Sequence, residues 1–190
     1  MGFKKANAAL AMLTFLTGIV HIGSVVFMYV MEWYYATFLQ VTAGIFMTLT
    51  MLHAILGIIA ITALGDGMKR DPYKKQNMNT IIQRTSGILM LPLLFLHANT
   101  FELLTKNIIS NNMIVFGLLL AVQIIFFADV LTHISLSVSR ALITLGFITS
   151  CERRDKVDRV VYILCGCMFV AAAVAVTRFD IKLIDMIRNV

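Results

Sequence analysis

The sequence predicts an all-α integral membrane protein, a bundle of five transmembrane helices forming one domain over residues 1–190. Apolar residues make up 59% of the chain and charged residues only 14%, whereas soluble domains carry about 25% charged residues. The sequence contains five long apolar stretches, and a helix needs ~20 apolar residues to cross ~30 Å of hydrocarbon. Only helices and closed barrels satisfy their backbone hydrogen bonds in lipid, so we expect stretches this long to be helical.

A short aromatic segment separates the first two spans. Residues 8–31 form the first span, which is too long for the apolar region of a signal peptide and is therefore predicted to be retained. Residues 38–64 form the second span. Trp33, Tyr34 and Tyr35 lie between the two spans and are typical of the aromatic belt at a membrane surface.

The other three spans are separated by polar connections. Residues 80–104 form the third span, after a polar stretch, 65–79, in which Pro72 prevents simple continuation of a helix. Residues 113–143 form the fourth span and residues 157–177 the fifth. The tail that follows alternates apolar and charged residues at helical spacing, so we expect it to lie along the outer membrane interface.

Basic residues collect on one side of the predicted bundle. Lysine and arginine in connecting segments mark the cytoplasmic side of a membrane. They precede span one and recur between spans two and three and between spans four and five (Lys4, Lys5, Lys69, Arg70, Lys74, Lys75, Arg153, Arg154, Lys156 and Arg159). We therefore expect the N-terminus in the cytoplasm and the C-terminus outside. The net charge of +6 reflects this topology, and we expect no nucleic-acid partner.

The chain has only four histidines, and each lies in a different apolar span. A helix rises ~1.5 Å per residue, so position along a span converts to depth in the membrane. His21 and His97 fall ~20 Å and ~25 Å from the inner surface, whereas His53 and His133 fall ~16 Å and ~15 Å from it. The histidines therefore form an outer pair and an inner pair, each drawn from two helices.

Two histidines at one depth on facing helices can bind one cofactor between them. Two such pairs suit two stacked haems, and a haem with histidine on both faces of its iron transfers electrons. We predict two b-type haems, the outer bound by His21 and His97 and the inner by His53 and His133. The alternative is that the histidines only hydrogen-bond neighbouring helices. A zinc or copper site is less favoured, because no carboxylate or cysteine joins either pair.

Small and polar residues near the histidines are candidates for contacts at the haem edges. Ser137 and Arg140 follow His133 by four and seven residues, so they lie on its helix face toward the cytoplasm. Arg140 is a candidate partner of an inner-haem propionate, and the alternative is an arginine that snorkels to the surface. Gly18 and Gly57 each lie one turn from a histidine, where a missing side chain favours either a porphyrin or close helix packing.

One histidine in each of the first four of five membrane helices resembles the dihaem cytochrome b anchor of succinate:quinone oxidoreductases, which include fumarate reductases and succinate dehydrogenases. The segment "QRTSGILMLPLLFLH", Gln83 to His97, is similar to the family segment with an arginine, a serine–glycine pair and a haem histidine. This similarity makes Arg84 and Ser86 further haem-edge candidates. In the family, helices one and three share the outer haem and helices two and four the inner haem, the pairing that depth indicates here.

The resemblance implies a subunit that has no catalytic activity alone. Cytoplasmic flavoprotein and iron–sulfur subunits would interconvert succinate and fumarate, and electrons would pass through both haems to or from a quinone of the respiratory chain. The resemblance also implies a bacterial cytoplasmic (inner) membrane and menaquinone as the quinone, and it leaves a dimer of the whole complex open. The chain itself has no cysteines spaced to bind an iron–sulfur cluster.

Three acidic residues are candidates for handling the protons of quinone chemistry. Asp129 is the one acid deep within a predicted span, and acids inside a membrane are functional candidates by default. A structural hydrogen bond to a neighbouring helix is its alternative role. Glu32 and Glu102 lie near the outer surface, where each either lines a quinone pocket beside the outer haem or is simply solvated.

Two other functions fit the same sequence. A dihaem cytochrome b of another respiratory complex, such as a hydrogenase or nitrate reductase, often places two haem histidines on one helix, whereas no span here carries two. A haem-free transporter or scaffold would use its histidines structurally. A visible absorption spectrum separates the haem-free alternative from both cytochromes.

Overall fold

A computed structural model of the chain describes residues 2–33, 35–64 and 74–188. Each helix in these residues is long and apolar enough to cross a membrane. The helices are α1 (Phe3–Met31), α2 (Ala36–Leu64), α3 (Lys74–Ile109), α4 (Met113–Leu145) and α5 (Cys151–Arg188). The predicted fold class, an all-α five-helix membrane bundle, is confirmed, and the chain is a multi-pass membrane protein. Tyr34 and the connection that contains Pro72 lie outside the described residues.

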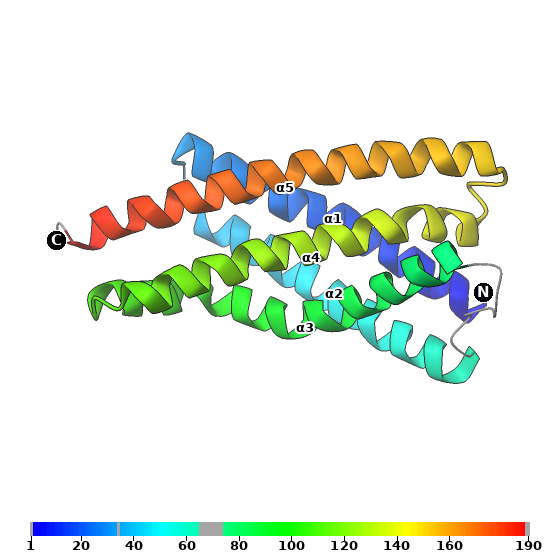
Figure 1. Cartoon of the computed structure of the whole chain (residues 1–190), viewed down its shortest axis with the longest axis horizontal. Helices are drawn as coiled ribbons and strands as arrows, with labels where there is room; N and C mark the ends of the chain where they lie inside the picture. The colour runs from blue at the N-terminus through cyan, green and yellow to red at the C-terminus, as the bar shows by residue number, and fades with distance from the viewer. Residues whose placement is uncertain (1, 34, 65–73, 189–190) are drawn as a thin grey trace.

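Successive helices run in opposite directions along the bundle (Figure 1). The N-terminus, the start of α3 and the α4–α5 turn lie at one end, which we call the N-terminal end. The α1–α2 turn, the α3–α4 turn and the C-terminus lie at the other, the C-terminal end. There, α5 and the α3–α4 hairpin extend well beyond the α1–α2 turn (Figure 1), because α1 and α2 have 29 residues each whereas α3, α4 and α5 have 36, 33 and 38.

The C-terminal tail, which the sequence predicts to lie along the membrane interface, continues α5 without a break to Arg188. Its apolar side chains pack against the α3–α4 hairpin in a buried cluster (Leu104, Ile108, Phe116 and Leu183). At the tip, Arg188 Nη2 donates a hydrogen bond of 2.8 Å to Asn111 Oδ1. The alternation of apolar and charged residues in the tail therefore reflects packing on protein.

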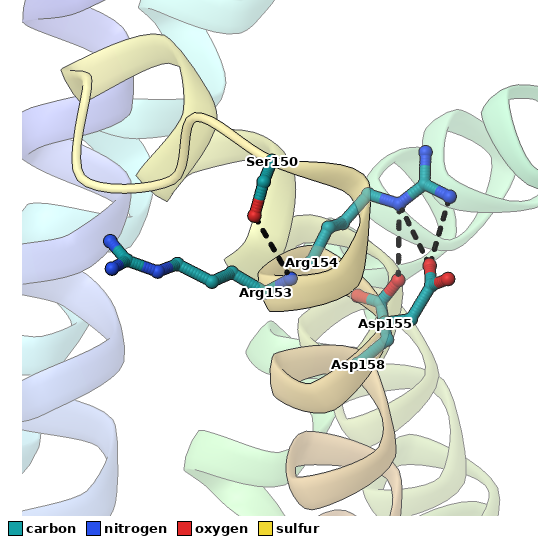
Figure 2. Close-up of polar contacts among 5 residues, drawn as sticks. All are labelled: Ser150, Arg153, Arg154, Asp155 and Asp158. Carbon is teal, nitrogen blue, oxygen red and sulfur yellow. Dashed lines mark hydrogen bonds and ion pairs between the residues drawn. The ribbon is translucent and has the colours of Figure 1, made fainter.

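The connection from α4 to α5 is a short, well-defined turn. Gly146 caps the C-terminus of α4, and its φ of +90° is a left-handed conformation that glycine adopts freely. The Oγ atom of Ser150 accepts a hydrogen bond of 3.3 Å from the backbone N–H of Arg153 at the start of α5 (Figure 2). Arg154 pairs with Asp155 at 2.9 Å and with Asp158 at 4.0 Å, so part of the basic charge of this turn is neutralised locally.

Helix packing leaves a space inside the bundle. α1 packs mainly against α2, and α3 packs mainly against α4, which also contacts α1 and α5. Within the described ranges, α2 makes no extended contact with α3, α4 or α5. Two cavities lie between the α1–α2 pair and the α3–α4 pair, and α5 also lines one of them.

Candidate functional site

Each of the two cavities is lined by two histidines from different helices. The first has a volume of about 460 Å³ and is lined by His53 of α2 and His133 of α4. The second has a volume of about 280 Å³ and is lined by His21 of α1 and His97 of α3. We call them the His53–His133 cavity and the His21–His97 cavity. The structure therefore brings together the same two pairs that depth along the sequence indicates.

The two rings of the His53–His133 cavity have a spacing that suits a shared metal ion. Their centroids are 6.4 Å apart and their planes are inclined by 69°. Two metal–nitrogen bonds of ~2.0 Å, with ~1.1 Å from each nitrogen to its ring centre, give a centroid separation of roughly 6.2 Å. The observed spacing fits one metal ion bound between the rings.

Hydrogen bonds to the protein hold both histidines of this cavity. His133 Nδ1 lies 2.9 Å from the carbonyl oxygen of Gln83 and 3.2 Å from Ser86 Oγ, both on α3. His53 Nδ1 lies 2.9 Å from Asn7 Oδ1 on α1. Each ring therefore uses Nδ1 for the protein and keeps Nε2 for another partner, which is the usual arrangement of a metal-binding histidine.

A polar network lines the His53–His133 cavity toward the N-terminal end of the bundle. Arg140 Nη1 donates hydrogen bonds to Gln83 Oε1 and, at 3.2 Å, to the Thr80 hydroxyl. Gln83 Nε2 in turn donates to Ser137 Oγ at 2.8 Å. Two further basic residues line the same cavity (Lys4 and Arg84). These positive charges suit an anionic group such as a carboxylate at this end of the cavity.

The His21–His97 cavity has mainly apolar walls around its two imidazoles. His21 stacks on Phe46 with ring centroids 6.0 Å apart, and its Nδ1 lies 3.3 Å from the Thr42 hydroxyl. His97 stacks on Phe126 with centroids 4.8 Å apart. The Nδ1 atom of His97 is buried and has no hydrogen-bond partner, which is uncommon in folded proteins. Two nitrogen donors among apolar side chains suit a flat apolar cofactor.

Phe46 and Val130 line both cavities and therefore lie between them. Phe46 packs over Gly18, where an added Cβ would lie 2.9 Å from its Cε2 atom. Gly18 thus makes room for Phe46 and lines neither cavity. Gly57 does line the His53–His133 cavity, and a Cβ added there would have nothing within 4 Å. Of the two glycines, Gly57 therefore suits a close approach by a cofactor.

The three acids predicted to handle protons lie away from both cavity surfaces. Asp129 is buried in α4, and its Oδ2 atom has no hydrogen-bond partner. Glu32 follows α1 at the surface, where a hydrogen bond from Lys182, 2.7 Å away, lowers the pKa of its carboxyl. Glu102 is exposed and pairs with Lys106 at 2.6 Å. Proton handling by these acids therefore stays a prediction.

Sequence reasoning missed a buried polar pair in the His21–His97 cavity. Gln123 Nε2 donates a hydrogen bond of 3.0 Å to Asp180 Oδ2, and both side chains line the cavity. Asp180 belongs to the tail that the sequence predicts to lie along the outer membrane interface, because charged residues end the apolar stretch of the fifth span. The available signal was Gln123, a lone amide deep in an apolar span that needs a hydrogen-bond partner in lipid.

The fold and its cavities define a class, multi-pass α-helical membrane proteins with two internal sites lined by paired histidines. In the part of the chain that the structure describes, no three histidine, cysteine, aspartate or glutamate side chains gather as ligands of one metal ion. No family model, curated protein or solved structure matches the chain. Its function is therefore inferred from the two cavities.

Proposed function

We propose that the chain is a dihaem cytochrome b that anchors a succinate:quinone oxidoreductase in the bacterial cytoplasmic membrane. The observation that carries this proposal is the presence of two cavities, each with a histidine pair from two different helices. The 6.4 Å spacing of the His53 and His133 rings supports it further. A haem held by two histidines has no open coordination position and supplies a one-electron carrier.

The residues of each cavity have distinct tasks in this proposal. His21 and His97 would hold one haem, and His53 and His133 the other. Phe46, which lies between the cavities, keeps the two cofactors apart. The basic side chains of the His53–His133 cavity would neutralise haem propionates in a setting where unpaired charge is costly (Lys4, Arg84 and Arg140).

The proposed orientation places the N-terminal end in the cytoplasm, because most basic connecting residues lie there. Flavoprotein and iron–sulfur subunits would then dock beside the His53–His133 cavity, and electrons would pass between them and a quinone, menaquinone in this proposal, near the His21–His97 cavity. Asp180, hydrogen-bonded to Gln123 in that cavity, is the carboxyl best placed to exchange protons with the quinone.

The first test is the haem content of the purified chain. A dithionite-reduced minus oxidised spectrum and a pyridine haemochrome assay should give two b-type haems per chain. His53→Ala and His133→Ala should each lose the haem of the His53–His133 cavity and retain the haem of the His21–His97 cavity. Thr48→Ala, which changes an exposed residue on the helix of His53, should retain both haems. A well-folded chain without haem would refute the proposal.

The second test concerns the complex. Affinity purification of the chain from its native membranes should recover a flavoprotein and an iron–sulfur subunit, together with succinate-dependent quinone reduction or quinol-dependent fumarate reduction. Recovery of a hydrogenase or nitrate reductase subunit instead would assign the cytochrome to another respiratory complex.

A further inference from the structure

Two hydrogen-bond acceptors on α3 face the Nδ1 atom of His133. The carbonyl oxygen of Gln83 lies 2.9 Å away, and a carbonyl can only accept. Ser86 Oγ lies 3.2 Å away, and its hydroxyl hydrogen is donated to the same Gln83 oxygen at 3.0 Å. The Ser86 oxygen is therefore left to accept as well. Two acceptors require that Nδ1 carries the ring hydrogen, which leaves the lone pair of the neutral ring on Nε2.

Gly87 allows the ring to approach these acceptors. A Cβ atom at position 87 would lie 3.1 Å from His133 Cε1 and 3.4 Å from His133 Nδ1. The ring therefore occupies space that a side chain at this position would fill. By contrast, a Cβ added at Gly44 of α2 or Gly117 of α4 would have nothing within 4 Å. The absence of a side chain at position 87 thus leaves room for the His133 ring.

His53, the other histidine of the cavity, has a different side-chain neighbour. Its Nδ1 atom lies 2.9 Å from the side-chain oxygen of Asn7. The oxygen and nitrogen of an amide exchange places when the group turns by half a rotation, so Asn7 can either accept from Nδ1 or donate to it. The Asn7 side chain alone therefore does not fix the hydrogen position of His53, whereas Gln83 and Ser86 fix that of His133.

We propose that Gly87, Ser86 and the Gln83 carbonyl are positioning groups that hold His133 as the Nδ1–H tautomer and present its bare Nε2 to the cavity before any cofactor binds. A ligand arranged in advance binds its metal without the cost of reorganisation. The purpose of this arrangement rests on the proposed function. The tautomer itself depends only on contacts within the protein, so it is measured without cofactor turnover.

The test is nitrogen NMR of the full-length chain, labelled with ¹⁵N-histidine, produced in a host that cannot make haem and held in lipid nanodiscs. Ring nitrogens with and without hydrogen give well-separated resonances, and those of His133 are identified by their loss in His133→Gln. We expect hydrogen on Nδ1 of His133 and none on Nε2. The opposite tautomer would overturn the proposal.

Three variants separate the positioning groups from general structural effects. Gly87→Ala should let His133 exchange between tautomers, with at least a tenfold rise in the Nε2–H population. Gly44→Ala adds the same methyl group in open space and should leave the spectrum unchanged. Gln83→Ala removes the bonds to Arg140 and Ser137 but retains the backbone carbonyl, so the tautomer should persist. An unchanged tautomer in Gly87→Ala would refute the role of Gly87.

A second measurement covers the case in which circular dichroism shows that the haem-free chain loses its helices. The chain from a normal host is then reduced with dithionite, which makes low-spin iron diamagnetic, and exchange of the His133 Nδ1 hydrogen with deuterium is followed. Exchange should be at least tenfold faster in Gly87→Ala than in Gly44→Ala, and equal rates would overturn the proposal. A chain that never binds haem but has the expected tautomer would refute the proposed function alone.

Discussion

Replacing Leu104 by alanine is expected to loosen the C-terminal end of α5. Leu104 is 1% exposed and belongs to the cluster that joins α3, α4 and α5. Exposed, paired Glu102 and Lys106 flank it in α3, so this turn lies in a polar environment where burial of apolar groups is stabilising. Removing three buried carbon groups costs about 2.4 kcal/mol at ~0.8 kcal/mol each. The cavity left behind raises the cost to about 3 kcal/mol.

This loss is measured best as a local opening of α5. Because 1.4 kcal/mol corresponds to a tenfold change in an equilibrium, backbone amides beyond Arg178 should exchange with deuterium about 100-fold faster in Leu104→Ala. Mass spectrometry of the C-terminal peptide follows that exchange. Ile109→Ala, a change at a residue of the same helix that is 71% exposed, should have no such effect. If exchange in Leu104→Ala equals that of the wild type, the tail does not depend on this cluster and the packing described here is wrong.

Three further predictions concern charged residues. The hydrogen bond from Lys182 lowers the pKa of Glu32. The ion pair therefore stabilises the fold above the ordinary glutamate pKa, and this stabilisation is lost as the pH falls through the lowered pKa. The difference in thermal stability between wild type and Glu32→Gln should accordingly vanish on acidification. If the chain has the proposed function, Asp180→Asn should slow quinone-linked turnover more than Asp129→Asn, with both haem spectra unchanged, because Asp180 lines a cavity and Asp129 does not; equal losses would contradict this. In the proposed dihaem cytochrome, Arg140→Leu should lower the midpoint potential or occupancy of the haem bound in the His53–His133 cavity, measured by redox titration, because a positive charge is lost beside it.

The sequence was sufficient for the class of fold and for the grouping of the histidines. Apolar stretches longer than a membrane is thick have one stable backbone solution, a helix, so the five helices follow directly. The helical rise is constant and successive spans run in opposite directions, so residue number fixes depth. This is why His21 falls level with His97 and His53 with His133, as the two cavities bear out.

Helix ends were less predictable, because a charged residue ends an apolar stretch without ending a helix. α5 continues through Arg178 and Lys182, both of which pair with Glu32 at 3.7 and 2.7 Å. Its apolar residues continue to pack on the α3–α4 hairpin. The helical continuation of the tail therefore depends on packing against the α3–α4 hairpin, which the hydropathy of the tail segment alone does not reveal.

Only the tertiary structure decided which way each side chain faces. In a soluble helix the polar face marks the outside, but a helix in lipid is apolar on all sides, so its sequence carries little information about its rotation. The sequence therefore did not show that Asp180 lines a cavity whereas Asp129 lines neither. The contacts of His133 with Gly87 and the Gln83 carbonyl likewise exist only because α3 and α4 pack closely, which depth along the sequence does not determine.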